Sequence, residues 1–279
     1  MWRPYRWLRR DTGRVEGYDE RTYGERFAPV YDRWYEGITD ARACAALVAD
    51  LADLADDAGG GPVLELGVGT GRLAVPLAGL GVEVVGVDAS PAMLERLESN
   101  AADADADVEA VLADMVDPPL GDRSFAVVLL AYNTLFNLID PDAQRRCLAA
   151  AARRLLPGGS VVVEAFVPDQ PDPPGSTDGP GPEAAPPRDE ISIRTLTADE
   201  VVLAVSRSDP STQQAMGQYV DITESGISLR PWHIRWHTPD QLDVLAAEAG
   251  LVLADRWADW ARTPFGAAST AHVSRYVVG

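Results

Sequence analysis

The stretch VLELGVGTGR at 63–72 is the feature that most constrains how this chain can fold. Its apolar first half has the composition of a short buried strand. Its three glycines, Gly67, Gly69 and Gly71, then predict a tight turn into a helix, with the backbone close to a ligand. A strand, a glycine-rich turn and a helix in this order are typical of α/β folds built on a parallel sheet.

Strands and helices alternate after this turn. VEVVGVD, VEAVLAD, FAVVLLA and VVVEAFV are apolar runs of the kind that parallel strands show when both faces are covered. Ser90-Pro91 and Asp140-Pro141 are start signals for helices between them, and residues 40–57 have apolar side chains at helical spacing. The pattern predicts a doubly wound, seven-stranded, mostly parallel sheet, with LVLADRWADW and AHVSRYVV as its last two strands.

An insertion interrupts this alternation. ISIRTL, VVLAVSRS, QAMGQYVDIT and ISLRPWHIRW alternate with period two between turn signals, which predicts an antiparallel meander after the fifth strand. Thr238-Pro239-Asp240-Gln241 then predicts a capped helix and a return to the core. The expected division is an N-terminal helical cap (1–60), a Rossmann-like core (61–167 and 238–279), a Pro/Gly-rich loop (168–190) and a substrate-capping insertion (191–237).

Composition narrows the classes of function. The net charge of −19 opposes nucleic-acid binding, which normally needs a basic surface. The sequence contains no lysine, so P-loop and Schiff-base chemistries are excluded. Cys44 and Cys147 lack metal-ligand spacing, and we expect neither a disulfide nor a metal site. No segment has the pattern of a membrane span or a signal peptide, so we expect a cytoplasmic protein.

The glycine spacing argues against a dinucleotide. The glycines follow G-x-G-x-G, whereas pyrophosphate binding in dinucleotide folds uses G-x-G-x-x-G. Glu65 precedes the first glycine by two residues, and Asp88 and Asp114 end the next two predicted strands. These acids would line the crevice at the carboxyl ends of the parallel strands. Such an edge repels a pyrophosphate and suits a ligand with a ribose, an adenine and a positive charge.

Four segments, taken in order, resemble the motifs of the class I S-adenosylmethionine-dependent methyltransferases: ELGVGTG, VDASPAML, ADM and LAYNTLFNL. YDRWY at 31–35 and the meander resemble the small-molecule branch of that family, which includes amino-sugar N-methyltransferases. The resemblance spans residues from about 25 to 167 and from about 238 onward. It implies a Rossmann-like core and S-adenosyl-L-methionine as the cofactor.

The resemblance also implies roles for individual residues. The glycine turn would hold the methionine part of the cofactor, Asp88 the ribose, and the residues after the second and third strands the adenine. The fourth motif would line the sulfonium, and N-terminal tyrosines would close over the methionine end and the substrate. The implied cofactor-binding residues are Tyr23, Tyr31, Glu65, Gly67, Gly69, Gly71, Arg72, Asp88, Ala89, Met93, Asp114, Met115, Ala131 and Tyr132.

Methyl transfer is mainly a problem of positioning, and a general base is optional. An amine acceptor needs only to be neutral, whereas a hydroxyl acceptor gains from a positioned base. The catalytic candidates are His233, His237 and Tyr35, and Asn133 and Asn137 after the fourth strand are candidates for substrate binding.

The segment PWHIRWH leaves two arrangements open. Period two places His233, Arg235 and His237 on one face of a strand and Trp232, Ile234 and Trp236 on the other. If the first face turns to the pocket, a histidine is the base and Arg235 clamps an anion. If the second face does, the tryptophans shape the substrate site and the histidines are solvated.

The sequence therefore predicts a cytoplasmic methyltransferase that acts at nitrogen or oxygen of a small molecule, such as a natural-product or sugar intermediate. A protein methyltransferase, a nicotinamide-dependent oxidoreductase and a non-catalytic binding protein of the same fold remain alternatives. Exposed strands of the meander would allow a homodimer. Neither nucleic acid nor a membrane is an expected partner.

Overall fold

A computed structural model describes residues 15–38, 40–55, 60–168 and 186–279. Most of the Pro/Gly-rich segment, and the first part of the expected N-terminal cap, lie outside these residues. In chain order the elements are α1 (Thr22–Phe27), α2 (Tyr31–Tyr35), α3 (Ala41–Asp53), β1 (Val63–Leu66), α4 (Ala74–Ala78), β2 (Val84–Asp88), α5 (Pro91–Asp103), β3 (Val108–Leu112), β4 (Phe125–Leu130), the 3₁₀ helix η1 (Thr134–Asn137), α6 (Pro141–Arg153), β5 (Leu155–Phe166), β6 (Arg188–Leu196), β7 (Glu200–Asp209), β8 (Gln214–Thr223), β9 (Gly226–Arg235), α7 (Pro239–Glu248), β10 (Leu251–Trp257) and β11 (Ala271–Val278).

A seven-stranded sheet, called here the large sheet, forms the core. Its strand order is β10-β11-β5-β4-β1-β2-β3. The strands from β5 to β3 pair in parallel, and β11 is antiparallel to both of its neighbours. This arrangement confirms the doubly wound, mostly parallel sheet expected from the apolar runs.

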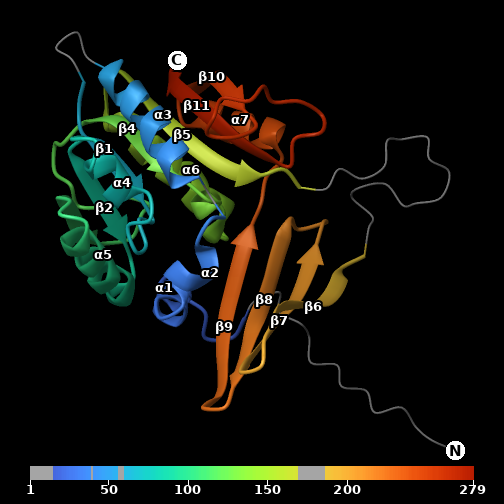
Figure 1. Ribbon diagram of the computed structural model, residues 1–279. Coiled ribbons are helices and arrows are strands. Elements are labelled where there is room, and N and C mark those ends of the chain that lie inside the picture. The colour runs from blue at the N-terminus through green and yellow to red at the C-terminus, as the bar shows by residue number, and fades with distance from the viewer. Residues whose placement is uncertain (1–14, 39, 56–59, 169–185) are drawn as a thin grey trace, which may run out of the picture.

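Helices cover both faces of the large sheet (Figure 1). Successive residues of β1 point to opposite faces, so Val63 packs in the cluster with α3, α4 and α5, while Leu64 packs in the cluster with α6 and α7. Every residue of β1 and of β4 is buried. The sheet is therefore fixed on both sides, and the loops at its carboxyl edge stand on a rigid support.

Side-chain caps begin the longer helices where the sequence signals them. Ser90 accepts a hydrogen bond from the Met93 N–H at the start of α5, and Asp140 caps α6. Thr238 and Gln241 form a reciprocal capping box at the start of α7.

The four remaining strands form an antiparallel sheet, called here the small sheet, in the order β6-β7-β8-β9. It is the meander expected after the fifth strand. Helices α1 and α2 lie between the small sheet and the core (Figure 1). They join it through a cluster of apolar and aromatic side chains that includes Phe27, Trp34 and Val202. Arg33 adds a two-pronged ion pair with Glu200, with both distances at 2.7 Å.

No helix in the described part of the chain is long and apolar enough to cross a membrane. Cys44 and Cys147 are free and buried. Across the same described residues, no group of three or more histidine, cysteine, aspartate or glutamate side chains is arranged to hold a metal ion.

Candidate active site

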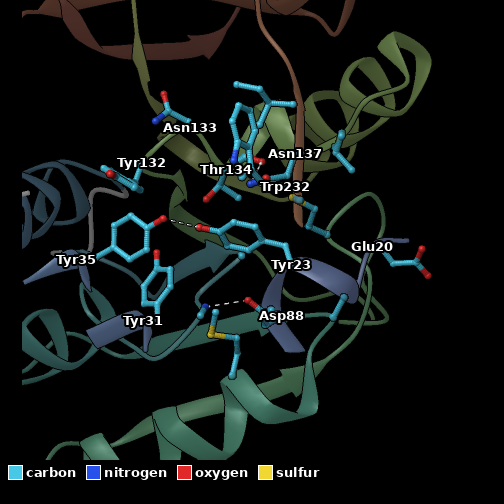
Figure 2. Close-up of a pocket in the computed structure, with 18 of the residues that line it drawn as sticks. Glu20, Tyr23, Tyr31, Tyr35, Asp88, Tyr132, Asn133, Thr134, Asn137 and Trp232 are labelled. Carbon is cyan, nitrogen blue, oxygen red and sulfur yellow. Dashed lines mark hydrogen bonds between the residues drawn. The ribbon is translucent and has the colours of Figure 1, made fainter. Parts of the chain in front are cut away.

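A cavity of about 270 Å³ lies at the carboxyl ends of β1, β2 and β4 (Figure 2). The loops after these strands form one side of it, helices α1 and α2 close over it, and strands β8 and β9 complete the wall. Its lining residues are Tyr18, Glu20, Tyr23, Gly24, Tyr31, Tyr35, Gly67, Gly69, Asp88, Ala89, Met93, Asp114, Met115, Tyr132, Asn133, Thr134, Asn137, Leu138, Phe166, Tyr219, Trp232 and Ile234.

The three glycines of the turn differ in what they contact. All have positive φ, at +69° for Gly67, +57° for Gly69 and +81° for Gly71. Gly67 and Gly69 line the cavity, whereas Gly71 does not. A Cβ on Gly71 would come within 2.2 Å of the Leu97 side chain. Gly71 is therefore required for close packing against α5, and only the first two glycines face a ligand.

Asp88 closes the turn from the end of β2. Its two carboxylate oxygens each accept a backbone N–H. One comes from Gly69 at 2.9 Å (Figure 2) and the other from Ser90 at 2.9 Å. Burial raises the pKa of the Asp88 carboxyl, and these N–H donors oppose the rise. The carboxylate is thus fixed at the cavity wall with lone pairs left for further donors.

Glu65 and Arg72 are two ionisable residues at the start and the end of the glycine turn. The Glu65 side chain is 4% exposed, and burial raises its pKa to about 8, with Arg72 opposing the rise. Glu65 Oε2 and the Nε and Nη1 atoms of Arg72 are buried without a hydrogen-bond partner among the described residues. Such orphaned atoms are costly unless a ligand satisfies them. An ammonium group of a ligand suits Glu65 Oε2, and a carboxylate of a ligand suits the Arg72 guanidinium.

Tyrosine rings form the opposite wall. Tyr23 and Tyr35 bring their hydroxyl oxygens to 3.3 Å, and the ring of Tyr31 lies 4.6 Å from that of Tyr35, between centroids (Figure 2). Tyr132 packs edge-on against Tyr35 at 5.6 Å, and the Arg72 guanidinium lies 5.0 Å above its ring. Burial raises the pKa of all four phenols. They remain neutral at physiological pH and can donate as well as accept hydrogen bonds.

Tyr132 has an unusual backbone conformation, which it shares with the next residue. Both Tyr132 and Asn133 have left-handed backbones, with φ of +48° and +63°. The Glu164 carboxylate accepts the Tyr132 N–H at 2.8 Å, and the Glu164 carbonyl accepts the Asn133 N–H at 2.9 Å. Asn133 Oδ1 in turn accepts the Phe166 N–H at 2.7 Å. Strand β5 thus holds the two strained residues in place.

The aromatic face of β9 turns to the cavity. Trp232 and Ile234 line it, whereas His233, Arg235 and His237 do not. The expectation that the histidines are then solvated is wrong. His233 is fully buried beside Gln214, and His237 is 9% exposed with Nε2 2.6 Å from Gln144 Oε1.

Burial also lowers the pKa of His237 to about 4. The geometry therefore gives no support to either histidine as the base, or to Arg235 as an anion clamp. A structural reason is plain: the strand alternation places their side chains opposite to those that form the wall.

Comparisons with known proteins agree with this geometry. A family model described as "Methyltransferase domain" matches residues 63–159. The solved structure of the CcbJ methyltransferase from Streptomyces caelestis is 38% identical in sequence, with a TM-score of 0.81, and the match covers 94% of this chain and 100% of the other. This chain belongs to the S-adenosylmethionine-dependent methyltransferases.

Two further relatives of this methyltransferase span most of its length. The cypemycin N-terminal methyltransferase of Streptomyces sp is 28% identical over 254 residues, covering 90% of this chain and 95% of the relative. The SAM-bound structure of CalS10, an amino pentose methyltransferase from Micromonospora echinaspora, shares the fold with a TM-score of 0.59 at 21% identity, covering 88% of this chain and 96% of the other.

The residues at hand fit the cofactor of this family. S-adenosylmethionine has a ribose, which suits the fixed Asp88 carboxylate, and an amino-acid end, which suits the orphaned Glu65 and Arg72 atoms. Most of the residues singled out in the sequence line the cavity. Those that do not are Glu65, Gly71, Arg72, Ala131, His233, Arg235, His237 and Trp236, the last of which packs against the core of the large sheet instead.

The sequence reasoning missed several lining residues, namely Tyr18, Glu20, Gly24, Thr134, Leu138, Phe166, Tyr219 and Ile234. A signal was available for Ile234, because the period-two alternation of β9 places it on the same face as Trp232, although it was not named as a site residue. The others depend on how distant segments meet, which no local pattern shows.

Proposed function

We propose that this methyltransferase transfers a methyl group from S-adenosylmethionine to an amine nitrogen of a small natural product. The observation that carries the proposal is the wall of neutral tyrosine side chains, Tyr23, Tyr31, Tyr35 and Tyr132, around the cavity. The cofactor supplies an activated methyl group, so what the protein must add is binding and orientation.

The placement of the histidines favours nitrogen over oxygen. His233, His237 and His272 are all the histidines of the chain, and each is buried away from the cavity lining. A neutral amine attacks through its own lone pair and releases its proton afterwards, whereas a hydroxyl gains from a base that takes its proton during the attack. Two proteins of similar fold have names that refer to nitrogen, the sugar N-methyltransferase KedS8 and the glycopeptide N-methyltransferase MtfA.

The cofactor would occupy the end of the cavity nearest to β1 and β2. We propose that Asp88 accepts hydrogen bonds from the ribose hydroxyls and that Ala89, Met93, Asp114 and Met115 contact the adenine. The orphaned atoms support the placement of the amino-acid end, with its ammonium at Glu65 and its carboxylate at Arg72. Gly67, Gly69, Ala131 and Tyr132 would adjoin the sulfonium.

The acceptor would enter at the other end, between the tyrosines and the small sheet. Asn133 and Asn137 offer amide groups there, and Trp232 offers an aromatic surface for a partly apolar ring. Here the N-terminal cap (1–60) would close over both ligands and the insertion (191–237) would select the acceptor. A cytoplasmic location is part of the proposal and is supported by two unpaired cysteines.

Pairs of matched acceptor compounds test whether the enzyme methylates nitrogen or oxygen. Purified protein is incubated with S-adenosylmethionine and pairs of compounds that differ only by an amine in place of a hydroxyl, including amino sugars and their parent sugars. We expect demethylated cofactor and an N-methylated product from the amine alone, at a rate that rises with pH as the amine loses its proton. Methylation of the hydroxyl compound and not the amine would contradict the proposal.

A peptide amine is a second candidate because the cypemycin relative matches over most of this chain. Peptides with free and blocked N-termini therefore belong in the same assay. Asp88→Ala serves as the control for the site, since loss of its charge-assisted hydrogen bonds, each worth about 1.5–3 kcal/mol, should abolish turnover at ordinary cofactor concentrations.

A further inference from the structure

Two buried hydroxyl groups lie next to residues of the cavity lining. Thr70 follows Gly69 in the glycine turn, and Ser90 follows Ala89 after β2. The first residue of each pair lines the cavity, whereas the hydroxyl residue is buried and is not part of the described lining. A buried hydroxyl normally has a hydrogen-bond partner. Both hydroxyls have a carboxylate as that partner, one on α2 and one on α1, the helices that close over the cavity.

Asp32 of α2 joins the glycine turn to α5. Its Oδ1 atom accepts the Thr70 hydroxyl at 2.5 Å, and its Oδ2 atom accepts Arg96 Nη2 at 3.0 Å and Asn100 Nδ2 at 3.3 Å. Asn100 Nδ2 also donates to the Thr70 carbonyl at 2.9 Å. Hydrogen bonds between charged groups are stronger than those between neutral ones, and here they combine with two further donors. Asp32 therefore fixes α2 to two parts of the core at once.

Glu25 of α1 makes the corresponding contact at the other segment. The Ser90 hydroxyl donates to Glu25 Oε1 at 2.9 Å, and the same oxygen accepts the Ala92 N–H at 3.4 Å, in the first turn of α5. The neighbouring Gly24 lies directly against Ser90, since a Cβ at this position would come within 2.3 Å of the Ser90 Cβ. The lack of a side chain at Gly24 thus allows α1 to approach closely enough for Glu25 to reach its partners.

The helices that carry these two acids also carry tyrosines of the cavity wall. Tyr23 lies on α1, Tyr31 and Tyr35 lie on α2, and the three phenols meet in the cavity (Figure 2). Helix α1 has six residues and α2 has five, and helices so short are not stable on their own. The position of the tyrosines therefore depends on the side-chain contacts that fix these helices to the rest of the protein.

We infer that Asp32 and Glu25 are positioning residues that hold these tyrosines over the bound cofactor. The inference rests on the proposed placement of the ribose at Asp88, because that carboxylate accepts the N–H groups of Gly69 and Ser90. The cofactor and the two helices thus bind the same two backbone segments, the glycine turn and the segment after β2. A ligand that orders these segments favours closure of α1 and α2, and closure favours binding of the ligand by the same factor.

Titration calorimetry with S-adenosylhomocysteine measures the effect on affinity. We expect Asp32→Ala and Glu25→Ala each to weaken binding about tenfold, because hydrogen bonds to a charged group are lost. Asp32→Asn keeps an oxygen for the Thr70 hydroxyl and should weaken binding less, by about threefold. The control is Asp50→Ala, which removes a carboxylate that binds Arg262 at 2.9 Å outside the described cavity lining, and it should bind as the wild type does.

Amide hydrogen exchange separates positioning from a general loss of stability. In the wild type, saturation with S-adenosylhomocysteine should slow the exchange of the amides of α1, α2 and the glycine turn. In the saturated Asp32→Ala and Glu25→Ala variants, the amides of α1 and α2 should keep most of their ligand-free exchange rate. The amides of the large sheet should be protected as in the wild type, which shows that both variants are folded.

Three outcomes would contradict the inference, and they are distinguishable. Wild-type affinity and wild-type protection in both alanine variants would overturn it and leave the proposed function intact. Faster exchange throughout the large sheet of these variants would assign the two acids a general structural role and would also overturn it. If Asp88→Ala binds S-adenosylhomocysteine as the wild type does, the proposed placement of the cofactor is wrong, and the inference fails with it.

Discussion

At the residue scale, the geometry of Tyr132 depends on Glu164. Two consecutive left-handed residues other than glycine cost of order 1–3 kcal/mol each. The Glu164 side chain offsets part of this cost by accepting the Tyr132 N–H at 2.8 Å. Glu164 does not line the cavity, and its side chain acts there through the backbone of Tyr132, which makes it a positioning residue.

We predict that Glu164→Ala weakens cofactor binding about tenfold, which corresponds to about 1.4 kcal/mol, because the unpaired N–H lets the Tyr132 ring leave its place over Arg72. Glu164→Gln keeps an acceptor oxygen and should bind the cofactor within about twofold of wild type. Titration calorimetry with S-adenosylmethionine measures both. Equal impairment of the two variants would show that the charge of Glu164, rather than its hydrogen bond, is what matters.

Sequence reasoning identified Tyr132 and Asn133 but could not find Glu164. It lies in the run VVVEAFV, whose pattern shows only a strand, and it reaches Tyr132 because β4 pairs with β5 across 32 residues. Gly71 shows the opposite case. The glycine spacing identified Gly71, but not its role in packing against Leu97. A local pattern predicts the backbone conformation of a glycine, whereas the neighbour that a Cβ would clash with depends on the tertiary structure.

At the element scale, Arg194 joins the small sheet to α2. A register shift between Ile193 and Thr195 interrupts β6, and a bulge of this kind re-aims a side chain. The Arg194 guanidinium donates to the Trp34 carbonyl at 2.7 Å and lies about 5 Å from the rings of Trp34, Tyr35 and Tyr219. Arg194 therefore acts as a clamp that holds Tyr35, a residue of the cavity lining, in place.

We predict that Arg194→Ala lowers kcat/KM about tenfold and stability by about 2 kcal/mol, because a charged hydrogen bond and cation–π contacts are lost together. Urea unfolding and steady-state kinetics measure the two effects. Glu200→Gln is the matched control, since it breaks the link between the same two elements at Arg33, whose side chain is 57% exposed. The Glu200 side chain is 12% exposed, but water screens the charge of its partner Arg33, and such a pair is worth about 1 kcal/mol. A control as damaging as Arg194→Ala would therefore refute the clamp.

Most elements were predictable because their signals are local. Capping residues located α5, α6 and α7, and apolar runs located the parallel strands. The errors are at boundaries: α3 ends at Asp53 rather than near 57, and β5 begins at Leu155, well before the predicted run VVVEAFV. Pairing with β4 extends the strand there, and tertiary pairing is not visible in a local window.

At the scale of the whole molecule, the association of α1 and α2 with the small sheet could not be predicted. Arg33 meets Glu200 across 167 residues of sequence, and Arg194 meets Trp34 across 160. The cavity exists only because these segments come together over the edge of the large sheet. This explains why the cofactor end of the site, which lies on local motifs, was far more predictable than the acceptor end.

The free energy of unfolding should depend on pH through the protonation state of Glu65. Its pKa in the folded protein is about 8, against 4.5 as its ordinary value, so the folded state holds a proton that the unfolded state has released. The free energy of unfolding of the cofactor-free protein therefore falls as pH rises from about 4.5 to about 8. The contribution of this one group is on the order of 4 kcal/mol.

Glu65→Gln removes this dependence, because the amide is neutral at every pH. Urea unfolding at pH 5, 6, 7 and 8 should show that the variant gains stability over the wild type as pH rises, while Glu98→Gln, on the exposed face of α5, shows no such trend. Other buried carboxyls whose pKa does not depend on Glu65, such as Glu164, titrate alike in both proteins and cancel in the difference.

Cofactor binding should abolish the pH trend in the wild type. If the ammonium of the ligand pairs with Glu65, it stabilises the carboxylate and lowers its pKa toward the ordinary value. Saturation with S-adenosylhomocysteine, which has the same amino-acid end, should then make wild type and Glu65→Gln respond to pH in parallel. A difference that keeps its full size in the saturated proteins would mean that the ligand leaves Glu65 protonated, and the amino-acid end would have to be placed elsewhere in the cavity.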